Sequence, residues 1–338
     1  MAFITLKREN FFHNLDKIKE KTGSIEKIAL VLKDNAYGHG LCEMAELAQT
    51  YGITKAVVRS DAEAEQIEHF FEYILVLAEI PERATQKRHY TINDITTVEK
   101  FPKNTKVELK VDTGMHRNGI AMSELALAFE KIVECGLELE AVFTHHGAAD
   151  EMLPLYAEQK KAFREVKKES LILAKKHGIE NVQFHSCNSA ALFREESFSE
   201  DMARVGIAAY GCLELPEEFA SVELKPVLSL YAKKIASREL KKGDSVGYGA
   251  TFIAERACCV SSYDFGYGDG FLRLSSGVYE TPEGVKIAGR ISMDNSSFLS
   301  QKEELLLLND ARVAAKYAQT ISYEVLTALK KKISRKLV

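Results

Sequence analysis

Short apolar runs alternate with helical patterns through the first two thirds of the chain. Eight of these runs have the length and setting of buried strands: Ile28–Lys33, Ala56–Arg59, Tyr73–Leu77, His89–Asn93, Val107–Val111, Leu139–His145, Val182–Ser186 and Arg204–Ala209. Most segments between them are rich in Glu, Lys, Ala and Leu, and the clearest helices are predicted over Asn10–Lys21, Ala121–Cys135 and Ala157–His177. Eight strands that alternate with helices predict an α/β fold, a TIM-like (β/α)8 barrel.

The pattern changes after Gly211. Short alternating runs separated by turn signals follow at Val227–Ala232, Ala257–Val260 and Val285–Ala288. We therefore predict a C-terminal, mostly β domain over residues 224–338, after a barrel over residues 1–223. A short helix is predicted over Asn309–Ala318, and the basic tail Leu329–Val338 is expected to be a solvated end.

Composition narrows the class of protein. The chain has 338 residues, 46% of them apolar and 28% charged, which is enough for a barrel and a second domain. The net charge of −4 implies no basic face, so nucleic acid is not an expected partner. The sequence shows no apolar stretch of membrane-spanning length and no signal-peptide pattern, so we expect a cytoplasmic protein with no membrane partner. Six scattered cysteines without C-x-x-C pairs predict neither a metal site nor a disulfide framework.

The most informative polar stretch follows the first predicted strand. Lys33 comes directly after the apolar run Ile28–Leu32, and the glycine-punctuated loop Asp34–Gly40 follows at once. This order predicts a buried strand that delivers a single amine to the rim of a site. A neutral amine is what a Schiff base to an aldehyde cofactor or a carbonyl substrate requires.

Polar groups also gather where other predicted strands end, which is where barrel enzymes hold their active sites. They are Lys110 and Asp112–Arg117 for the fifth strand, Thr144–His146 for the sixth, and His185, Asn188 and Ser189 for the seventh. Arg204 starts the eighth predicted strand and Gly206 lies within it, so that strand fits the rule least well. A single lysine at a strand end is usually a solvated residue, but four such strand ends together favour a functional site.

These residues stand in motifs that together resemble bacterial alanine racemase, a family of pyridoxal phosphate (PLP) enzymes with a barrel and a β domain. The barrel motifs are Lys33–Gly40, Lys110–Arg117, His185–Ala191 and Arg204–Ile207. The second-domain motifs are Tyr248–Thr251, Gly266–Gly270, Gly289–Asp294 and Ser322–Val325. One such motif would be weak, whereas eight in family order are specific. The tail beyond Glu324 lacks the family's usual proline, and the resemblance is not extended through it.

The resemblance implies racemisation with two acid/base groups. Lys33 matches the lysine that holds PLP as a Schiff base and moves the α-proton on one face of the substrate. Tyr267 matches the tyrosine that serves the opposite face, and racemisation needs one group on each side. In the family this tyrosine comes from the partner subunit, which implies an active homodimer. Without the resemblance, Tyr267 could equally be a turn tyrosine at a domain edge.

The resemblance also implies a seat for the cofactor phosphate. The groups that would hold it are Tyr37, Ser189, Tyr323 and the backbone N–H groups of Gly206 and Ile207. This agrees with the tendency of barrels to bind phosphate after strands seven and eight. On the residues alone, Tyr323 could equally be a core tyrosine of the second domain.

Around the cofactor ring, Asn188 and His145 match lining residues, and Arg204 matches the arginine that faces the pyridine nitrogen, with His185 as its partner. A guanidinium stays protonated and only donates. We therefore expect the ring nitrogen to stay unprotonated, which weakens the electron sink and disfavours transamination. Without the resemblance, Arg204 could be a surface ion pair and both histidines could be structural.

The substrate carboxylate has two expected partners. Arg117 matches an arginine whose fork suits a carboxylate, and Met293 matches a residue that contributes its backbone N–H. Lys110 matches a lysine that can be carbamylated, which would turn it into an anion that pairs with Arg117. The sequence leaves this modification open.

The leading hypothesis is an alanine racemase that supplies D-alanine for peptidoglycan. A broader amino-acid racemase acting on serine or larger side chains stays open, because the size of the pocket is not readable from sequence. A PLP-binding protein without catalysis is disfavoured by the second domain and its Tyr267. A barrel-type decarboxylase is disfavoured by Arg204, since those enzymes generally place a carboxylate at the pyridine nitrogen.

Overall fold

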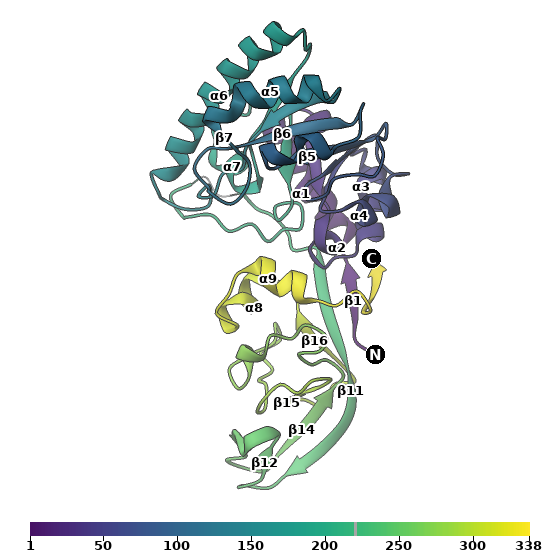
Figure 1. The fold of residues 1–338 in the computed structure, drawn as a ribbon. Helices are drawn as coiled ribbons and strands as arrows, with labels where there is room; N and C mark the ends of the chain where they lie inside the picture. The colour runs from purple at the N-terminus through teal and green to yellow at the C-terminus, as the bar shows by residue number, and fades with distance from the viewer. Residues whose placement is uncertain (220–221) are drawn as a thin grey trace.

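The computed structural model describes residues 1–219 and 222–338, which form a barrel with a second, mostly β domain at one end (Figure 1). Eight parallel strands make the barrel: β2 (Ile28–Val31), β3 (Lys55–Val58), β4 (Tyr73–Val76), β5 (Arg88–Ile92), β6 (Lys106–Asp112), β8 (Glu138–Phe143), β9 (Gln183–His185) and β10 (Ala203–Val205). Their order in the sheet follows the chain, and β10 pairs with β2. A bridge between Asn188 and Arg204 completes the ring. The predicted barrel is confirmed.

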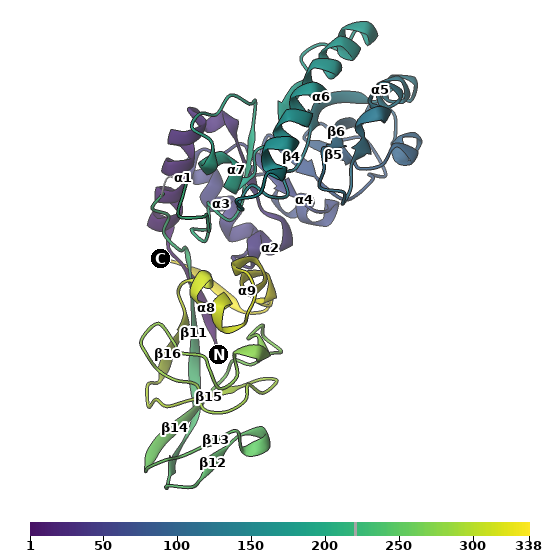
Figure 2. The same cartoon turned by 90° about the vertical axis from the view of Figure 1, so that its left-hand side faces the viewer.

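Helices cover the outside of the barrel (Figure 2). They are α1 (Arg8–Thr22), α3 (Leu41–Tyr51), α4 (Asp61–Ile67), α5 (Leu125–Glu134), α6 (Leu155–His177) and α7 (Ser189–Arg194). The three helices predicted in this half are confirmed as α1, α5 and α6. Helix α5 begins later than predicted because Ala121 ends the short strand β7 (Ile120–Ala121), which pairs with β6. Across the described ranges, no helix is long and apolar enough to cross a membrane.

The first barrel strand is shorter than predicted. Strand β2 ends at Val31, and Lys33 opens a helical turn, α2 (Lys33–Tyr37), instead of ending the strand. This turn is left-handed, with φ of +55° at Asp34 and between +50° and +59° through Tyr37. Each L-residue loses about 1–2 kcal/mol in this conformation, so the turn depends on contacts with the rest of the protein.

The eighth strand corrects another expectation. Strand β10 ends at Val205, whereas the sequence predicted a strand from Arg204 to Ala209. Gly206 and Ile207 therefore lie just beyond the strand, at its carboxyl end, and not within it. The eighth strand thus follows the barrel rule as the others do.

The second domain is built on the long strand β11 (Leu228–Leu240), which leaves the barrel and enters a six-stranded sheet (Figure 1). The sheet order is β15 (Ser296–Phe298), β14 (Cys258–Tyr263), β11, β1 (Phe3–Leu6) and β17 (Ser334–Leu337), and β16 (Glu304–Leu308) also pairs with β11. Strands β12 (Ser245–Val246) and β13 (Phe252–Ile253) form a separate pair. The mostly β domain is confirmed, although the strand predicted over Val285–Ala288 is reduced to isolated bridges at Lys286 and Ile287.

Two helices of the second domain lie next to the barrel (Figure 2). Helix α8 (Ala311–Tyr317) confirms the prediction over Asn309–Ala318, and the Asp310 side chain caps it by accepting from the N–H of Arg312. Helix α9 (Ser322–Ala328) contacts α2, the turn that begins at Lys33. The second domain thus reaches the rim of the barrel through α9.

Both chain ends lie in the sheet of the second domain. Strand β1 pairs antiparallel with β11, although the sequence placed it in the barrel half. Strand β17 pairs parallel with β1, so the expectation that the basic tail is a solvated end is wrong. Alternate side chains of a strand point to opposite faces, and here Arg335 and Leu337 are partly buried while Lys336 is exposed. The run of charge conceals that alternation in the sequence.

Candidate active site

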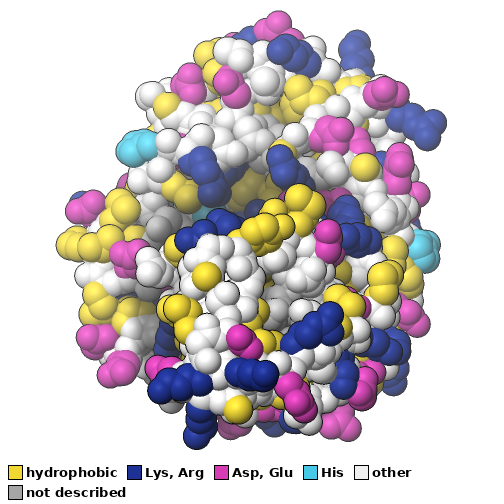
Figure 3. All heavy atoms as spheres, turned by 90° about the horizontal axis from the view of Figure 1, so that it is seen from below, with side chains coloured by type: hydrophobic (Ala, Val, Ile, Leu, Met, Phe, Trp, Pro, Cys, Tyr) yellow, Lys and Arg dark blue, Asp and Glu magenta, His cyan; other side chains and the backbone are white. Residues whose placement is uncertain are grey.

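A cavity of about 710 Å³ opens at the carboxyl ends of the barrel strands, where α9 meets the barrel. This volume suits a cofactor together with a small substrate. The view from the second-domain side shows Lys and Arg side chains gathered around a hollow (Figure 3). The predicted site residues that line the cavity are Lys33, Tyr37, Lys110, Arg117, His145, Asn188, Ser189, Arg204, Gly206, Ile207 and Tyr323. His185, Tyr267 and Met293 are not among the lining residues.

The left-handed turn that presents Lys33 is held first by a buried carboxylate. Oε1 of Glu63 accepts the N–H groups of Asp34 (2.7 Å) and Asn35 (3.4 Å), and its Oε2 accepts from the N–H of Arg59 (2.9 Å). The Asn35 side chain in turn accepts from the N–H of Leu41 at 3.1 Å. The N–H groups of Asp34 and Asn35 lie at the start of the turn, where backbone donors have no acceptor within the turn itself, and Glu63 supplies that acceptor.

The far end of the turn is held by His39 and by the C-terminal tail. Burial lowers the pKa of His39 to about 4, so the ring is neutral, and its Nδ1–H donates to the carbonyl of Tyr37 at 3.0 Å. The His39 ring stacks on Tyr210 with centroids 4.4 Å apart. The Arg335 guanidinium donates twice to the carbonyl oxygen of Gly38, at 3.1 and 2.8 Å. The turn is therefore fixed by both domains.

Hydroxyl and amide donors meet at one corner of the cavity. The Tyr37 ring lies 5.8 Å from that of Tyr323, and a Cβ on Gly206 would stand 2.8 Å from the Tyr37 hydroxyl oxygen. Oγ of Ser189 accepts from the N–H groups of Gly206 (3.0 Å) and Ala208 (3.3 Å). Burial raises the pKa of both tyrosines, so both are neutral hydrogen-bond donors. This is the donor set of a phosphate seat.

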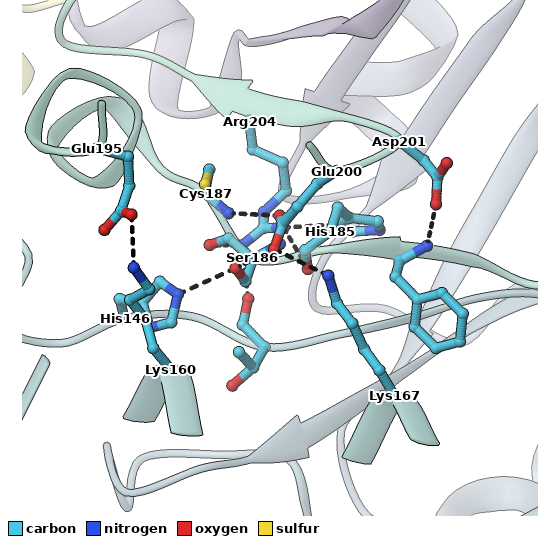
Figure 4. Close-up of polar contacts among 12 residues, drawn as sticks. His146, Lys160, Lys167, His185, Ser186, Cys187, Glu195, Glu200, Asp201 and Arg204 are labelled. Atoms are coloured by element: carbon cyan, nitrogen blue, oxygen red, sulfur yellow. Dashed lines mark hydrogen bonds and ion pairs between the residues drawn. The ribbon is translucent and has the colours of Figure 1, made fainter. Parts of the chain in front are cut away.

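Arg204 is buried in the cavity wall and held by acceptors at the carboxyl ends of two neighbouring strands, β8 and β9 (Figure 4). Its Nη1 donates to Nδ1 and to the carbonyl oxygen of His185, the latter at 3.2 Å. Its Nη2 donates to the carbonyl oxygens of Thr144 (2.7 Å) and Ser186 (3.3 Å). The bonds found in the described residues engage both terminal nitrogens, so the Nε–H is the donor left for the cavity. The predicted pairing of Arg204 with His185 is present.

Behind His185 stands a carboxylate that the sequence reasoning missed. Oε2 of Glu108 accepts from Nε2 of His185 at 2.8 Å, and Oε1 accepts from the Tyr73 hydroxyl (2.5 Å) and from Nδ1 of His89 (3.1 Å). Burial alone would raise the pKa of Glu108, yet the bonds from His185 and His89 hold it well below its usual range. Glu108 and Lys110 stand two residues apart, between the apolar residues Val107, Leu109 and Val111, and that spacing was the available signal.

The loop after β9 is held by a second buried carboxylate, Glu200 (Figure 4). It accepts from the N–H and Oγ of Ser186 and from the N–H of Cys187, and it pairs with Lys167 at 3.3 Å. This loop delivers Asn188, whose side chain accepts from the N–H of Ala191 and so caps α7. The loop that carries Asn188 and Ser189 is thus rigidly placed.

The cationic side of the cavity holds Lys110 and Arg117. Lys110 is buried and donates to the side-chain oxygen of Asn118, whereas Arg117 is exposed to the cavity mouth. Burial, and then the charges of Arg117 and Arg204, lower the pKa of Lys110 to about 8. His145 faces the same space, and burial followed by the Arg204 charge lowers its pKa well below 6.5. The site therefore favours anionic ligands.

Tyr267 and Met293 lie together on the second domain. The N–H of Gly268 donates to the carbonyl oxygen of Met293 at 2.8 Å, and the N–H of Tyr267 donates to that of Ser292 at 3.0 Å. Tyr267 is 41% exposed and Met293 is 56% exposed. The two residues lie side by side on the exposed surface of the second domain, and neither lines the Lys33 cavity of the same chain.

The comparisons with known proteins agree with this architecture. The chain matches the family Alanine racemase, N-terminal domain, over residues 6–214 and the family Alanine racemase, C-terminal domain, over residues 227–337. The second match includes the tail beyond Glu324, which lacks the family's usual proline. The whole chain is 44% identical to an alanine racemase of Nitratiruptor sp., with 99% of both chains covered. It is also 44% identical to an alanine racemase of Campylobacter concisus, with 100% of both chains covered.

Solved structures give the same result. An alanine racemase of Bacillus anthracis is 28% identical with a TM-score of 0.88, and one of Clostridium difficile is 25% identical with a TM-score of 0.89. Each comparison covers 100% of this chain and 95% of the other. Sequence, fold and the residues around the cavity thus agree, and the chain belongs to the alanine racemase family.

Proposed function

We propose that this protein interconverts L- and D-alanine with PLP, and that Lys33 and the Tyr267 of a partner subunit are its two bases. The observation that carries the proposal is the cavity around Lys33, in which hydroxyl donors, the Lys33 amine and four further Lys or Arg side chains converge at the carboxyl ends of the barrel strands. Alanine racemase is the activity named for relatives that match this chain from end to end.

The residues around the cavity fit PLP. The corner formed by Tyr37, Ser189, Tyr323 and the backbone after β10 would hold the phosphate, and Lys33 would hold the aldehyde carbon. The absence of a Cβ at Gly206 leaves room for the Tyr37 hydroxyl beside the backbone donors. Once bound, PLP withdraws electrons from the substrate α-carbon and makes its proton acidic.

The two bases would act from opposite sides. Nζ of Lys33 would approach the substrate from the barrel side of the cavity. The Tyr267 hydroxyl would enter from the partner subunit, because Tyr267 is exposed on the surface of its own chain. One group removes the α-proton while the other supplies a proton to the opposite face. Arg117 would bind the substrate carboxylate, and the Met293 backbone N–H of the partner would assist it.

Lys110 would act as a carbamate. A neutral amine adds to CO₂ and releases a proton, which leaves a carboxylate anion attached to Nζ. The lowered pKa of about 8 supplies that neutral amine near neutral pH. The product would convert a repulsive contact with Arg117 into an attractive one. His145, Asn188 and Arg204 would line the ring, with Arg204 donating through its Nε–H.

The test is a comparison of three proteins. Wild type should carry a visible cofactor band and convert L-alanine to D-alanine, Lys33→Ala should lose both, and Tyr267→Phe should keep the band and lose turnover. A colourless wild type, or full turnover in Tyr267→Phe, would refute the mechanism. A panel of other L-amino acids separates the narrow racemase from the broader one, and D-alanine auxotrophy of a deletion strain would support the peptidoglycan role.

Mixing the two inactive variants tests the shared site. In a one-to-one mixture half of the dimers are mixed, and each mixed dimer holds one complete site if Tyr267 acts across the interface. About a quarter of wild-type activity should return. If Tyr267 serves its own chain, no mixed dimer holds a complete site and activity stays absent.

A further inference from the structure

We infer that Glu108 is a positioning residue for Arg204 and acts on it through His185. The inference rests on the proposed function, because it gives Arg204 the task of facing the cofactor ring. Glu108 is 1% exposed and sits in the barrel interior, on β6, behind the cavity wall that Arg204 forms. It is not among the residues that line the cavity.

The hydrogen bonds fix the tautomer of His185. A guanidinium can only donate, so Nδ1 of His185 must accept from Arg204. A neutral imidazole carries one proton, which must then sit on Nε2. That Nε2–H points to Oε2 of Glu108 at 2.8 Å. The direction of every bond from Arg204 to Glu108 is thus determined.

Glu108 itself is fixed by two further donors. The Tyr73 hydroxyl comes from β4 and Nδ1 of His89 comes from β5, and both reach Oε1. Three strands therefore aim a donor at this carboxylate, and a fourth supplies it. Such a network holds its members in one arrangement when its buried charges have partners, and both carboxylate oxygens of Glu108 have them.

Stability alone gives a poor reason for this carboxylate. An ionised group in a barrel interior is expensive, and apolar residues of similar volume serve a fold at least as well. Arg204 offers the reason. It is a buried cation at the cavity wall, and Glu108 places a compensating anion one imidazole away while also orienting the imidazole that receives Nη1. With both terminal nitrogens engaged, the plane of the guanidinium and the direction of its Nε–H are set.

Glu108→Gln tests the inference in the holoenzyme. The amide keeps the shape but can offer an N–H to Nε2 of His185, which moves the imidazole proton to Nδ1, against Arg204. We expect about a tenfold fall in kcat with an unchanged KM, a shifted cofactor absorbance band, and faster consumption of the cofactor during turnover. The matched control is Glu138→Gln, an exposed glutamate on the next barrel strand, which should behave as wild type.

Tyr73→Phe and His89→Gln each remove one donor to Glu108 and should change the absorbance band in the same direction by a smaller amount. A folded, cofactor-loaded Glu108→Gln with the kcat and spectrum of wild type would overturn the inference. If Glu108→Gln does not fold, unchanged spectra in both of the other variants would overturn it. A wild type without cofactor or racemisation would instead refute the proposed function, so the two failures are distinguishable.

Discussion

The contact between Arg335 and Gly38 leads to a quantitative prediction. Arg335→Ala removes two bonds from a charged donor, at 3.1 and 2.8 Å, to the end of the turn that begins at Lys33. Four successive L-residues in that turn have positive φ, a strain of about 4–8 kcal/mol that surrounding contacts must offset.

The size of the effect follows from the bonds lost. A hydrogen bond to a charged group contributes about 1.5–3 kcal/mol, and Arg335 is partly exposed, so we take about 2 kcal/mol for the pair. Because 1.4 kcal/mol corresponds to a factor of ten, the cofactor should bind about 30-fold more weakly. The mutant should still fold, because β17 keeps its backbone pairing with β1.

Titration of the cofactor-free protein with PLP, followed by absorbance, gives the dissociation constant. Arg335→Lys should lie between wild type and Arg335→Ala, since it keeps the charge but not the fork. Lys331→Ala is the control, because Lys331 is an exposed cation in the same tail. An Arg335→Ala protein that binds PLP as wild type does, within about twofold, would refute the idea that the tail holds the turn.

Three further predictions concern the cavity and the turn that carries Lys33. Gly206→Ala places a methyl group 2.8 Å from the Tyr37 hydroxyl oxygen and so displaces that hydroxyl from the phosphate corner. PLP affinity should therefore fall about tenfold in the same titration, and unchanged affinity would contradict this. The pKa of Lys110 is lowered to about 8, so the neutral fraction of its amine rises as pH increases through that value. We therefore expect ¹³C-bicarbonate to label wild type more at pH 9 than at pH 7 and to leave Lys110→Gln unlabelled. The absence of a carbamate signal from wild type at pH 9 would count against carbamylation of Lys110. Glu63→Gln turns an acceptor of three backbone N–H groups partly into a donor, so denaturant titration should show a loss of about 1–3 kcal/mol, and an unchanged midpoint would exclude this role.

The sequence predicted the barrel because its strands are short apolar runs, and a buried parallel strand needs no other signal. It also predicted which side chains would meet, since carboxyl ends of barrel strands converge wherever the exact boundaries fall. The left-handed turn was not predictable in this way. Its residues have no glycine until Gly38, and their conformation is held by the neighbouring His39 and by Glu63 and Arg335, which are distant in sequence.

Glu108 and the tail were missed for a related reason. A glutamate within an apolar strand and a run of lysines at a chain end both suggest solvent when only neighbours in sequence are considered. Glu108 finds its donors on three other strands, and Arg335 finds its acceptor on the first barrel loop. Polar residues whose partners are tertiary contacts leave little local pattern. The positions of Tyr267 and Met293 depend on a second subunit and stay a prediction.

The place of β1 bears on how the chain folds during synthesis. Phe3 pairs with Tyr231 on one side and with Ser334 on the other, so this strand is synthesised before any barrel strand and both of its partner strands are synthesised after all of them. The barrel can therefore fold around its own core while β1 is still unpaired. Strand β17 is synthesised after β1 and β11, and its pairing with β1 also brings Arg335 to Gly38. The turn that carries Lys33 therefore gains its bonds from Arg335 only after this arginine, 297 residues beyond Gly38, has been synthesised.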